Sequence, residues 1–143
     1  LALSHGAKLL IMDEPTSGLD PLSREEFCDL ILKVVKEEGV SVLFSTHITS
    51  DLMRVADDIV YIADGEVLAA GAIGELLAKY EVACFAEMPK EQVVGLKEVK
   101  NGYEGLIAAG APSDCAARRP ADLDALMIHL ETARKKEKEC PHS

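Results

Sequence analysis

Three short apolar runs limit what this chain can fold into. Residues 8–12, 40–45 and 58–63 are rich in apolar side chains, and each run is only five or six residues long. A short, unbroken apolar run is typical of a parallel strand that is buried on both faces. The segment between the first two runs has a helical pattern. The sequence therefore predicts an α/β fold with mainly parallel strands and flanking helices.

The segment between the first two runs carries clear helix boundaries. Asp20 followed by Pro21 is typical of a helix start, because a carboxylate can cap the free amides and proline suits the first turn. Gly39 is typical of a helix end, since glycine readily adopts the left-handed conformation there. The apolar residues expected on one face of this helix are Phe27, Leu30, Ile31, Val34 and Val35.

The rest of the chain gives weaker patterns. Asp64-Gly65 predicts a tight turn that joins the third apolar run to a following strand. An apolar stripe at Leu123, Leu126, Met127 and Leu130 predicts an amphipathic helix. The other expected elements are a helix over 49–56, a short helix over 73–79, a strand over 82–86, an undecided strand or helix over 93–100, and the full extent of the amphipathic helix over 122–138.

Composition excludes several classes of function. The 143 residues are 48% hydrophobic and 28% charged, which is typical of a globular protein. The net charge of −10 argues against nucleic-acid binding, which depends on clustered Lys and Arg. Apolar runs fall well short of the roughly 20 residues that span a bilayer, and no secretory signal is evident. We expect neither nucleic-acid binding nor direct membrane insertion.

The four cysteines are irregularly spaced. Cys28, Cys84, Cys115 and Cys140 form no C-x-x-C pair, so we expect free thiols in a reducing cytoplasm. A metal site that uses Cys140 and His142 stays open, but two residues are too few ligands for a structural site.

Two adjacent acids end the first apolar run. Asp13, at the carboxyl end of a buried parallel strand, lies where open α/β sheets bind ligands, and can bind Mg²⁺ beside nucleotide phosphates. Glu14 points in another direction and can polarise an attacking water. Taken alone, the Asp-Glu pair favours a solvated turn over a ligand site.

The residues that follow resemble a known family. The run Asp13-Glu14-Pro15-Thr16-Ser17-Gly18-Leu19-Asp20 resembles the Walker B motif and D-loop of ABC transporter ATPases. His47 lies 33 residues after Glu14, directly after the next strand, and matches the switch histidine of that family. The resemblance continues through residues 51–71 and covers residues 1 to about 80. The chain is thus similar to the C-terminal part of an ABC-type P-loop ATPase domain.

The resemblance implies a role for each matching residue. Asp13 would support Mg²⁺, Glu14 would be the catalytic glutamate, and His47 would contact the γ-phosphate of ATP. The D-loop would cross to a second ATPase subunit, and hydrolysis would drive a transmembrane permease. The protein would then be cytoplasmic and peripheral on the inner face of the cell membrane. The D-loop residues assigned by the resemblance are Ser17, Gly18, Leu19 and Asp20.

Other parts of the family pattern are missing from this sequence. It contains neither G-x-x-x-x-G-K-[ST] nor an L-S-G-G-Q-like run, and residues 1–6 resemble the helix that follows that signature. These 143 residues alone are therefore expected to bind ATP poorly. Two interpretations stay open: the C-terminal portion of a complete ATPase subunit, or a catalytically inert remnant or regulatory fragment.

The chain changes character near residue 81. We expect residues 1–80 to be the C-terminal part of the ATPase domain and residues 81–143 to be a small α+β accessory segment that ends in the amphipathic helix. Residues 120–127 resemble the C-terminal segment of ATPases that serve ABC-2-type exporters, which implies export. We expect the stripe of that helix to pack within the accessory segment, with contact to a second copy as the alternative.

Overall fold

A computed structural model describes residues 7–139 of the chain. The expected helix end over residues 1–6, and Cys140 with His142, lie outside the described residues. The chain divides into two compact units, Leu1–Ala56 and Asp57–Ser143. The boundary expected near residue 80 rests on where the family resemblance fades, and it stays a prediction.

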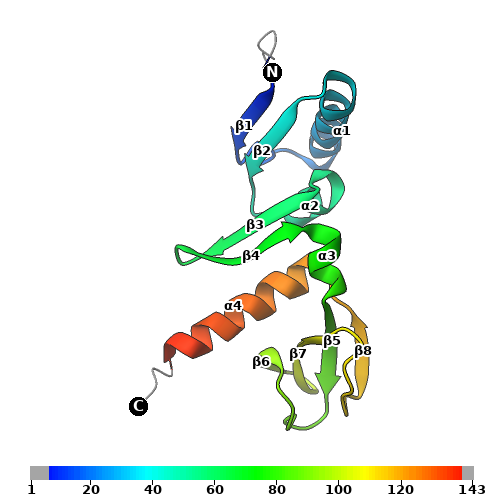
Figure 1. The fold of residues 1–143 in the computed structure, drawn as a ribbon, viewed down its shortest axis with the longest axis vertical. Coiled ribbons are helices and arrows are strands. Elements are labelled where there is room, and N and C mark those ends of the chain that lie inside the picture. The colour runs from blue at the N-terminus through cyan, green and yellow to red at the C-terminus, as the bar shows by residue number, and fades with distance from the viewer. Residues whose placement is uncertain (1–6, 140–143) are drawn as a thin grey trace. The chain divides into compact units, whose positions relative to one another are not determined.

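The first unit is a parallel strand pair with a helical crossover (Figure 1). Strands β1 (Leu9–Asp13) and β2 (Ser41–Ser45) pair in parallel, and their register sets Asp13 opposite Ser45. Helix α1 (Pro21–Glu38) connects them, and α2 (Thr49–Val55) follows β2. The predicted strands and helices of this unit are therefore confirmed.

Helix α1 begins and ends at the predicted residues. The Asp20 carboxylate accepts hydrogen bonds from the amides of Leu22 (3.0 Å) and Ser23 (3.1 Å), and Pro21 fills the first turn. The Ser23 hydroxyl also donates a hydrogen bond to the Asp20 carboxylate. This bond, followed by the bonds from the amides, lowers the pKa of Asp20. At the other end Gly39 has a φ of 64°, so the left-handed position falls on a residue without a Cβ. The residues of α1 that are buried are Cys28, Ile31 and Val34.

The strand pair is less buried than its sequence predicts. Leu9, Ile11 and Leu43 are 51%, 71% and 60% exposed, although they lie in apolar runs. Their alternation with half-buried neighbours places them on one face of the pair. One face of the pair is therefore uncovered in the part of the chain that the structure describes, although the apolar pattern is typical of strands covered on both faces.

The second unit begins with a hairpin. Strands β3 (Asp58–Ala63) and β4 (Glu66–Ala72) pair antiparallel, and helix α3 (Ile73–Ala78) follows. Asp64 and Gly65 between the strands have φ values of 50° and 77°, as a two-residue type I′ turn requires. The predicted tight turn and short helix are confirmed.

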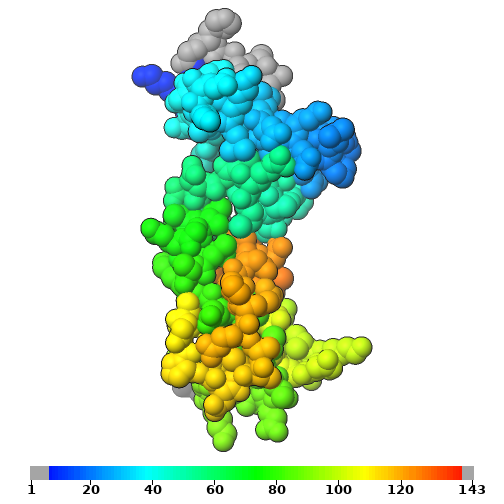
Figure 2. Space-filling model, turned by 90° about the vertical axis from the view of Figure 1, so that its right-hand side faces the viewer, coloured from blue at the N-terminus to red at the C-terminus, as the bar shows by residue number. Residues whose placement is uncertain are grey.

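The remaining residues form a four-stranded antiparallel sheet with a helix against it (Figure 1). The sheet order is β6-β7-β5-β8, and α4 packs mainly on β6. Residues 93–100 were predicted to form either a strand or a helix, and the structure shows a strand there. The strands over residues 102–108 and 117–120 were not predicted. Figure 2 shows the start of α4, in orange, beside the green residues of α3, which it contacts. The elements are β5 (Tyr80–Phe85), β6 (Val94–Val99), β7 (Gly102–Ala108), β8 (Ala117–Pro120) and α4 (Leu123–Glu139).

The predicted apolar stripe of α4 forms part of the core. Leu123 and Leu126 are each 1% exposed, and the helix packs on β6 and β7. The expected packing against residues 93–99 is confirmed, and α4 also contacts α3, which lies outside the accessory segment. Asp122 precedes the helix, and its carboxylate accepts a hydrogen bond from the amide of Ala125 at 2.8 Å. This bond lowers the pKa of Asp122, as expected for a capping carboxylate.

A buried histidine of α4 contacts two strands of the sheet. His129 is 1% exposed, and its Nδ1 lies 2.9 Å from the carbonyl oxygen of Gly95 in β6. Since a carbonyl only accepts, Nδ1 carries the hydrogen. Nε2 lies 3.4 Å from Oε1 of Glu104 in β7. A Cβ at Gly95 would lie 1.8 Å from the backbone oxygen of His129, so the crossing requires glycine.

Helix α4 also contacts the hairpin. The Tyr61 hydroxyl in β3 donates to Oε2 of Glu131 at 2.9 Å, and Arg134 forms an ion pair with Glu66 in β4. Burial, with the neighbouring Glu131 carboxylate, raises the pKa of Tyr61 to about 12. These contacts join the hairpin, α4 and the sheet into one unit. Among the described residues, no helix is both long and apolar enough to cross a bilayer.

Candidate functional site

The candidate site lies at the carboxyl ends of β1 and β2. Asp13 is the last residue of β1, and Ser45 is the last residue of β2. The Ser45 hydroxyl donates to Oδ1 of Asp13, and the Glu14 amide donates to the backbone oxygen of Ser45 at 3.0 Å. The parallel register brings the two strand ends together.

The two residues expected to do chemistry are in direct contact. Nδ1 of His47 lies 2.9 Å from Oε2 of Glu14, although 33 residues separate them in sequence. The His47 side chain is 73% exposed and that of Glu14 is 36% exposed, so both are accessible to a ligand. Glu14 has a φ of 45°, an uncommon backbone conformation for a residue with a side chain. A carboxylate beside an imidazole can hold or move a proton at a bound substrate.

The segment after Glu14 is a pair of turns that leads into α1. The Ser17 amide donates to the Glu14 carbonyl at 3.1 Å, and the Leu19 amide donates to the Thr16 carbonyl at 3.2 Å. Gly18 has a φ of 77°, which favours glycine. The predicted D-loop residues Ser17–Asp20 therefore begin within these two turns and end at the Asp20 cap.

Two buried polar residues lie on the segments that follow Glu14 and His47, and neither was predicted as a site residue. Thr16 is 1% exposed and Asp51 is 3% exposed, and the Thr16 hydroxyl donates to Oδ2 of Asp51 at 2.6 Å. The Arg24 Nε in α1 lies 3.9 Å from Oδ1 of Asp51. One sequence feature pointed to Asp51, namely its position four residues after His47, in the first turn of α2. No sequence feature pointed to its bond with Thr16.

The donor set at Asp13 suits a shared rather than a fully protein-bound cation. No group of three or more His, Cys, Asp or Glu side chains that could hold a metal occurs among residues 7–139. Mg²⁺ in nucleotide sites takes one or two carboxylates and completes its shell with phosphate oxygens and water. An exposed Asp13 carboxylate fits that demand.

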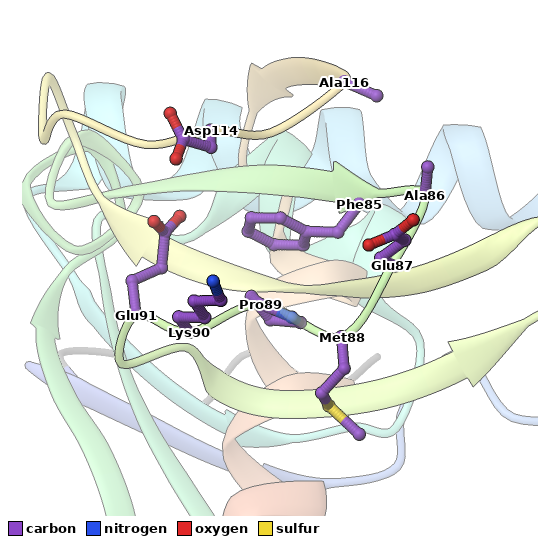
Figure 3. A pocket seen from close by; sticks show the side chains of 9 residues that line it. All are labelled: Phe85, Ala86, Glu87, Met88, Pro89, Lys90, Glu91, Asp114 and Ala116. Atoms are coloured by element: carbon purple, nitrogen blue, oxygen red, sulfur yellow. The ribbon is translucent and has the colours of Figure 1, made fainter.

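A separate hollow lies in the second unit (Figure 3). It has a volume of about 360 Å³ and contains none of the predicted site residues. Three carboxylates and one ammonium group surround it, with Phe85 at its apolar side (Figure 3). Ser113 already donates to the carboxylate of Glu91, one of the three. The residues that line it are Phe85, Ala86, Glu87, Met88, Pro89, Lys90, Glu91, Asp114 and Ala116.

Several curated proteins are similar in sequence to most or part of this chain. YxlF of Bacillus subtilis, an uncharacterized ABC transporter ATP-binding protein, is 36% identical over 119 residues, which are 83% of this chain and 39% of YxlF. The molybdenum import ATP-binding protein ModC of Rhodospirillum rubrum is 30% identical over 124 residues, 85% of this chain and 34% of ModC. The energy-coupling factor transporter ATP-binding protein EcfA2 of Mesoplasma florum is 35% identical over 80 residues, 56% of this chain and 25% of EcfA2.

These relatives define the class of protein that the chain resembles. Its homologues are ABC transporter ATP-binding proteins, and its mixed α/β fold is consistent with the C-terminal part of an ABC ATPase domain. The chain spans well under half of the length of each of these relatives. No protein-family model matches the chain.

Proposed function

We propose that this chain is the C-terminal part of the ATP-binding subunit of an ABC transporter. The observation that carries the proposal is the contact of Glu14 with His47, 2.9 Å apart, beside the Asp13 carboxylate at the ends of two parallel strands. Open α/β sheets bind ligands at this edge. The three relatives described above are each named as an ATP-binding protein, and YxlF and EcfA2 are named as ATP-binding proteins of a transporter, which supports ATP as the nucleotide.

In this proposal each residue has a separate role. Asp13, with its carboxylate fixed by Ser45, would hold Mg²⁺, which supplies charge neutralisation at the phosphates when bound. Glu14 accepts a proton from the attacking water. His47, with a hydrogen on both ring nitrogens, donates from Nδ1 to Glu14 and from Nε2 to a γ-phosphate oxygen. The turn Ser17–Asp20 would reach a second ATPase subunit as a D-loop. Catalysis is then mainly positioning and charge stabilisation.

We also propose a role in transport for the full-length protein. The full-length subunit would lie in the cytoplasm, on the inner face of the membrane, and would drive a transmembrane permease. The resemblance of residues 120–127 to ABC-2-type exporter ATPases supports export. ModC is named as an import protein, so the direction is a separate proposal from ATP hydrolysis.

A second candidate is a catalytically inert fragment. The sequence contains no G-x-x-x-x-G-K-[ST] loop, which favours this candidate for a polypeptide of these 143 residues alone. The two candidates differ for the full-length protein, since only the first expects it to bind and hydrolyse ATP.

Replacing His47 by Ala in the full-length protein tests the proposed role of the histidine. We expect ATP hydrolysis to fall, and ADP affinity to change by less than about twofold, because ADP lacks the γ-phosphate that His47 would contact. Phosphate release and equilibrium titration with each nucleotide measure the two effects. Ser50→Ala, an exposed change in the neighbouring helix α2, is the control. Equal losses of ATP and ADP binding would show that His47 is only a structural residue.

A further inference from the structure

A buried hydrogen bond connects the loop that carries Glu14 to helix α2, which follows His47 in the sequence. Thr16 lies two residues after Glu14, and Asp51 lies four residues after His47. The Thr16 hydroxyl donates to Oδ2 of Asp51 at 2.6 Å, and the two residues are only 1% and 3% exposed. A buried carboxylate is costly unless it is paired or hydrogen-bonded, so this bond is retained wherever the fold is intact.

The charge of Asp51 is partly balanced from α1. Arg24 Nε lies 3.9 Å from Oδ1 of Asp51, and this nitrogen is buried with no hydrogen-bond partner among the described residues. The guanidinium therefore offsets the charge of the carboxylate without a short, directional bond to it. The short bond from Thr16 is directional, so it can fix where the loop after β1 lies relative to α2.

These contacts close a ring through both catalytic side chains. One side runs along the chain from Glu14 through Pro15, whose φ is fixed by its ring, to Thr16. The other side runs back from Asp51 through the first turn of α2 to His47, and the contact of His47 with Glu14 completes it. The His47 contact is largely exposed, and exposed ion pairs hold geometry weakly. The buried hydrogen bond between Thr16 and Asp51 therefore constrains the position of the loop more strongly than the contact of His47 with Glu14 does.

We propose that Asp51 is a positioning residue, which acts through the Thr16 hydroxyl to hold Glu14 in register with His47. This inference rests on the proposed function, because it assigns Asp51 a part in ATP hydrolysis. Asp51 does not touch substrate in this arrangement. It fixes the backbone of the loop from which Glu14 reaches the water. A displacement of about 1 Å at such a group can lower a rate by about 100-fold.

A matched pair of variants at Thr16 tests the proposal in the full-length protein. Thr16→Val keeps the shape and removes the donor, whereas Thr16→Ser keeps the hydroxyl. We expect Thr16→Val to lower kcat by about 10-fold to 100-fold and to change KM for ATP by less than about twofold. Thr16→Ser is expected to recover most of the lost kcat. A role in stability alone would leave kcat per folded molecule unchanged.

Hydrogen exchange gives a second readout that needs no activity. The amides of Ser17 and Leu19 donate to Glu14 and Thr16 within the same loop, so they report its order. We expect Thr16→Val to speed their exchange by about 10-fold or more, and Thr16→Ser to leave it near the wild-type rate. The amides of α1 are the internal control for global folding. If Thr16→Val does not fold, Asp51→Asn replaces it, with an expected fall in kcat of about 10-fold.

The outcomes separate this inference from the proposed function. A kcat for Thr16→Val within twofold of wild type, or no recovery in Thr16→Ser, would overturn the positioning role. If the wild-type full-length protein hydrolyses no ATP, the proposed function fails. The coupling of Asp51 to the Glu14 loop is then decided by exchange at Ser17 and Leu19: faster exchange in Thr16→Val supports it, and unchanged exchange overturns it.

Discussion

Replacing Glu14 by Gln in the full-length protein is expected to preserve ATP binding and to lower turnover by about 10²-fold to 10⁴-fold. The amide has nearly the shape of the carboxylate, and its oxygen can still accept a hydrogen bond from Nδ1 of His47, 2.9 Å from the Glu14 carboxylate. It cannot accept the proton of the attacking water. The loss should therefore appear in kcat and not in KM.

Two further variants locate this effect. Glu38→Gln, an exposed change at the last residue of α1, is the control and should leave turnover unchanged. Asp13→Asn is expected to weaken the dependence on Mg²⁺, a phenotype that differs from loss of the base. Steady-state phosphate release and ATP titration measure all three variants. A turnover of Glu14→Gln within about threefold of wild type would rule out Glu14 as the base.

The largest expected effect on stability comes from Gly95→Ala. The new Cβ would lie 1.8 Å from the backbone oxygen of His129, and a backbone atom cannot move aside without moving α4. Gly95 also has a φ of 61°. We expect the second unit to lose about 3 kcal/mol or more, because overpacking and backbone strain each cost about 1–3 kcal/mol. Hydrogen exchange of the α4 amides in the full-length protein reports this loss.

Gly110→Ala is a matched control for that change. Gly110 has a φ of 72°, similar to that of Gly95, but a Cβ added at Gly110 would meet no atom within 4 Å. We expect a loss of about 1 kcal/mol from the left-handed backbone alone. Equal losses in the two variants would show that the close contact with His129 contributes nothing.

Elements with local boundaries could be predicted from the sequence. Asp20, Pro21 and Gly39 define the ends of α1 by hydrogen bonding and backbone conformation within a few residues. Strands β7 and β8 could not be predicted in this way. Gly102 and Gly105 interrupt the pattern of β7, and β8 is an exposed four-residue strand at the sheet edge. Their formation depends on distant pairing with β5.

The candidate site, like the fold, could be predicted only in part from the sequence. Asp13 and Glu14 were predicted from their place at the end of an apolar run, and the family resemblance supported them and added His47. The structure places Glu14 and His47 in contact. The pair Thr16 and Asp51 was not predicted as part of the site. Its bond depends on how α2 packs beside the loop after β1, and sequence spacing does not specify that packing. Burial of both side chains, visible only in the fold, makes the pair significant.

ATP hydrolysis at this site is tested most directly by phosphate release from ATP by the full-length protein, measured with Mg²⁺ and with the cation chelated. We expect Mg²⁺-dependent release that Glu14→Gln nearly abolishes while ATP remains bound. If the full-length protein binds Mg²⁺-ATP but releases no phosphate, or releases it equally well with Gln at position 14, Glu14 is not the base of an ATPase site.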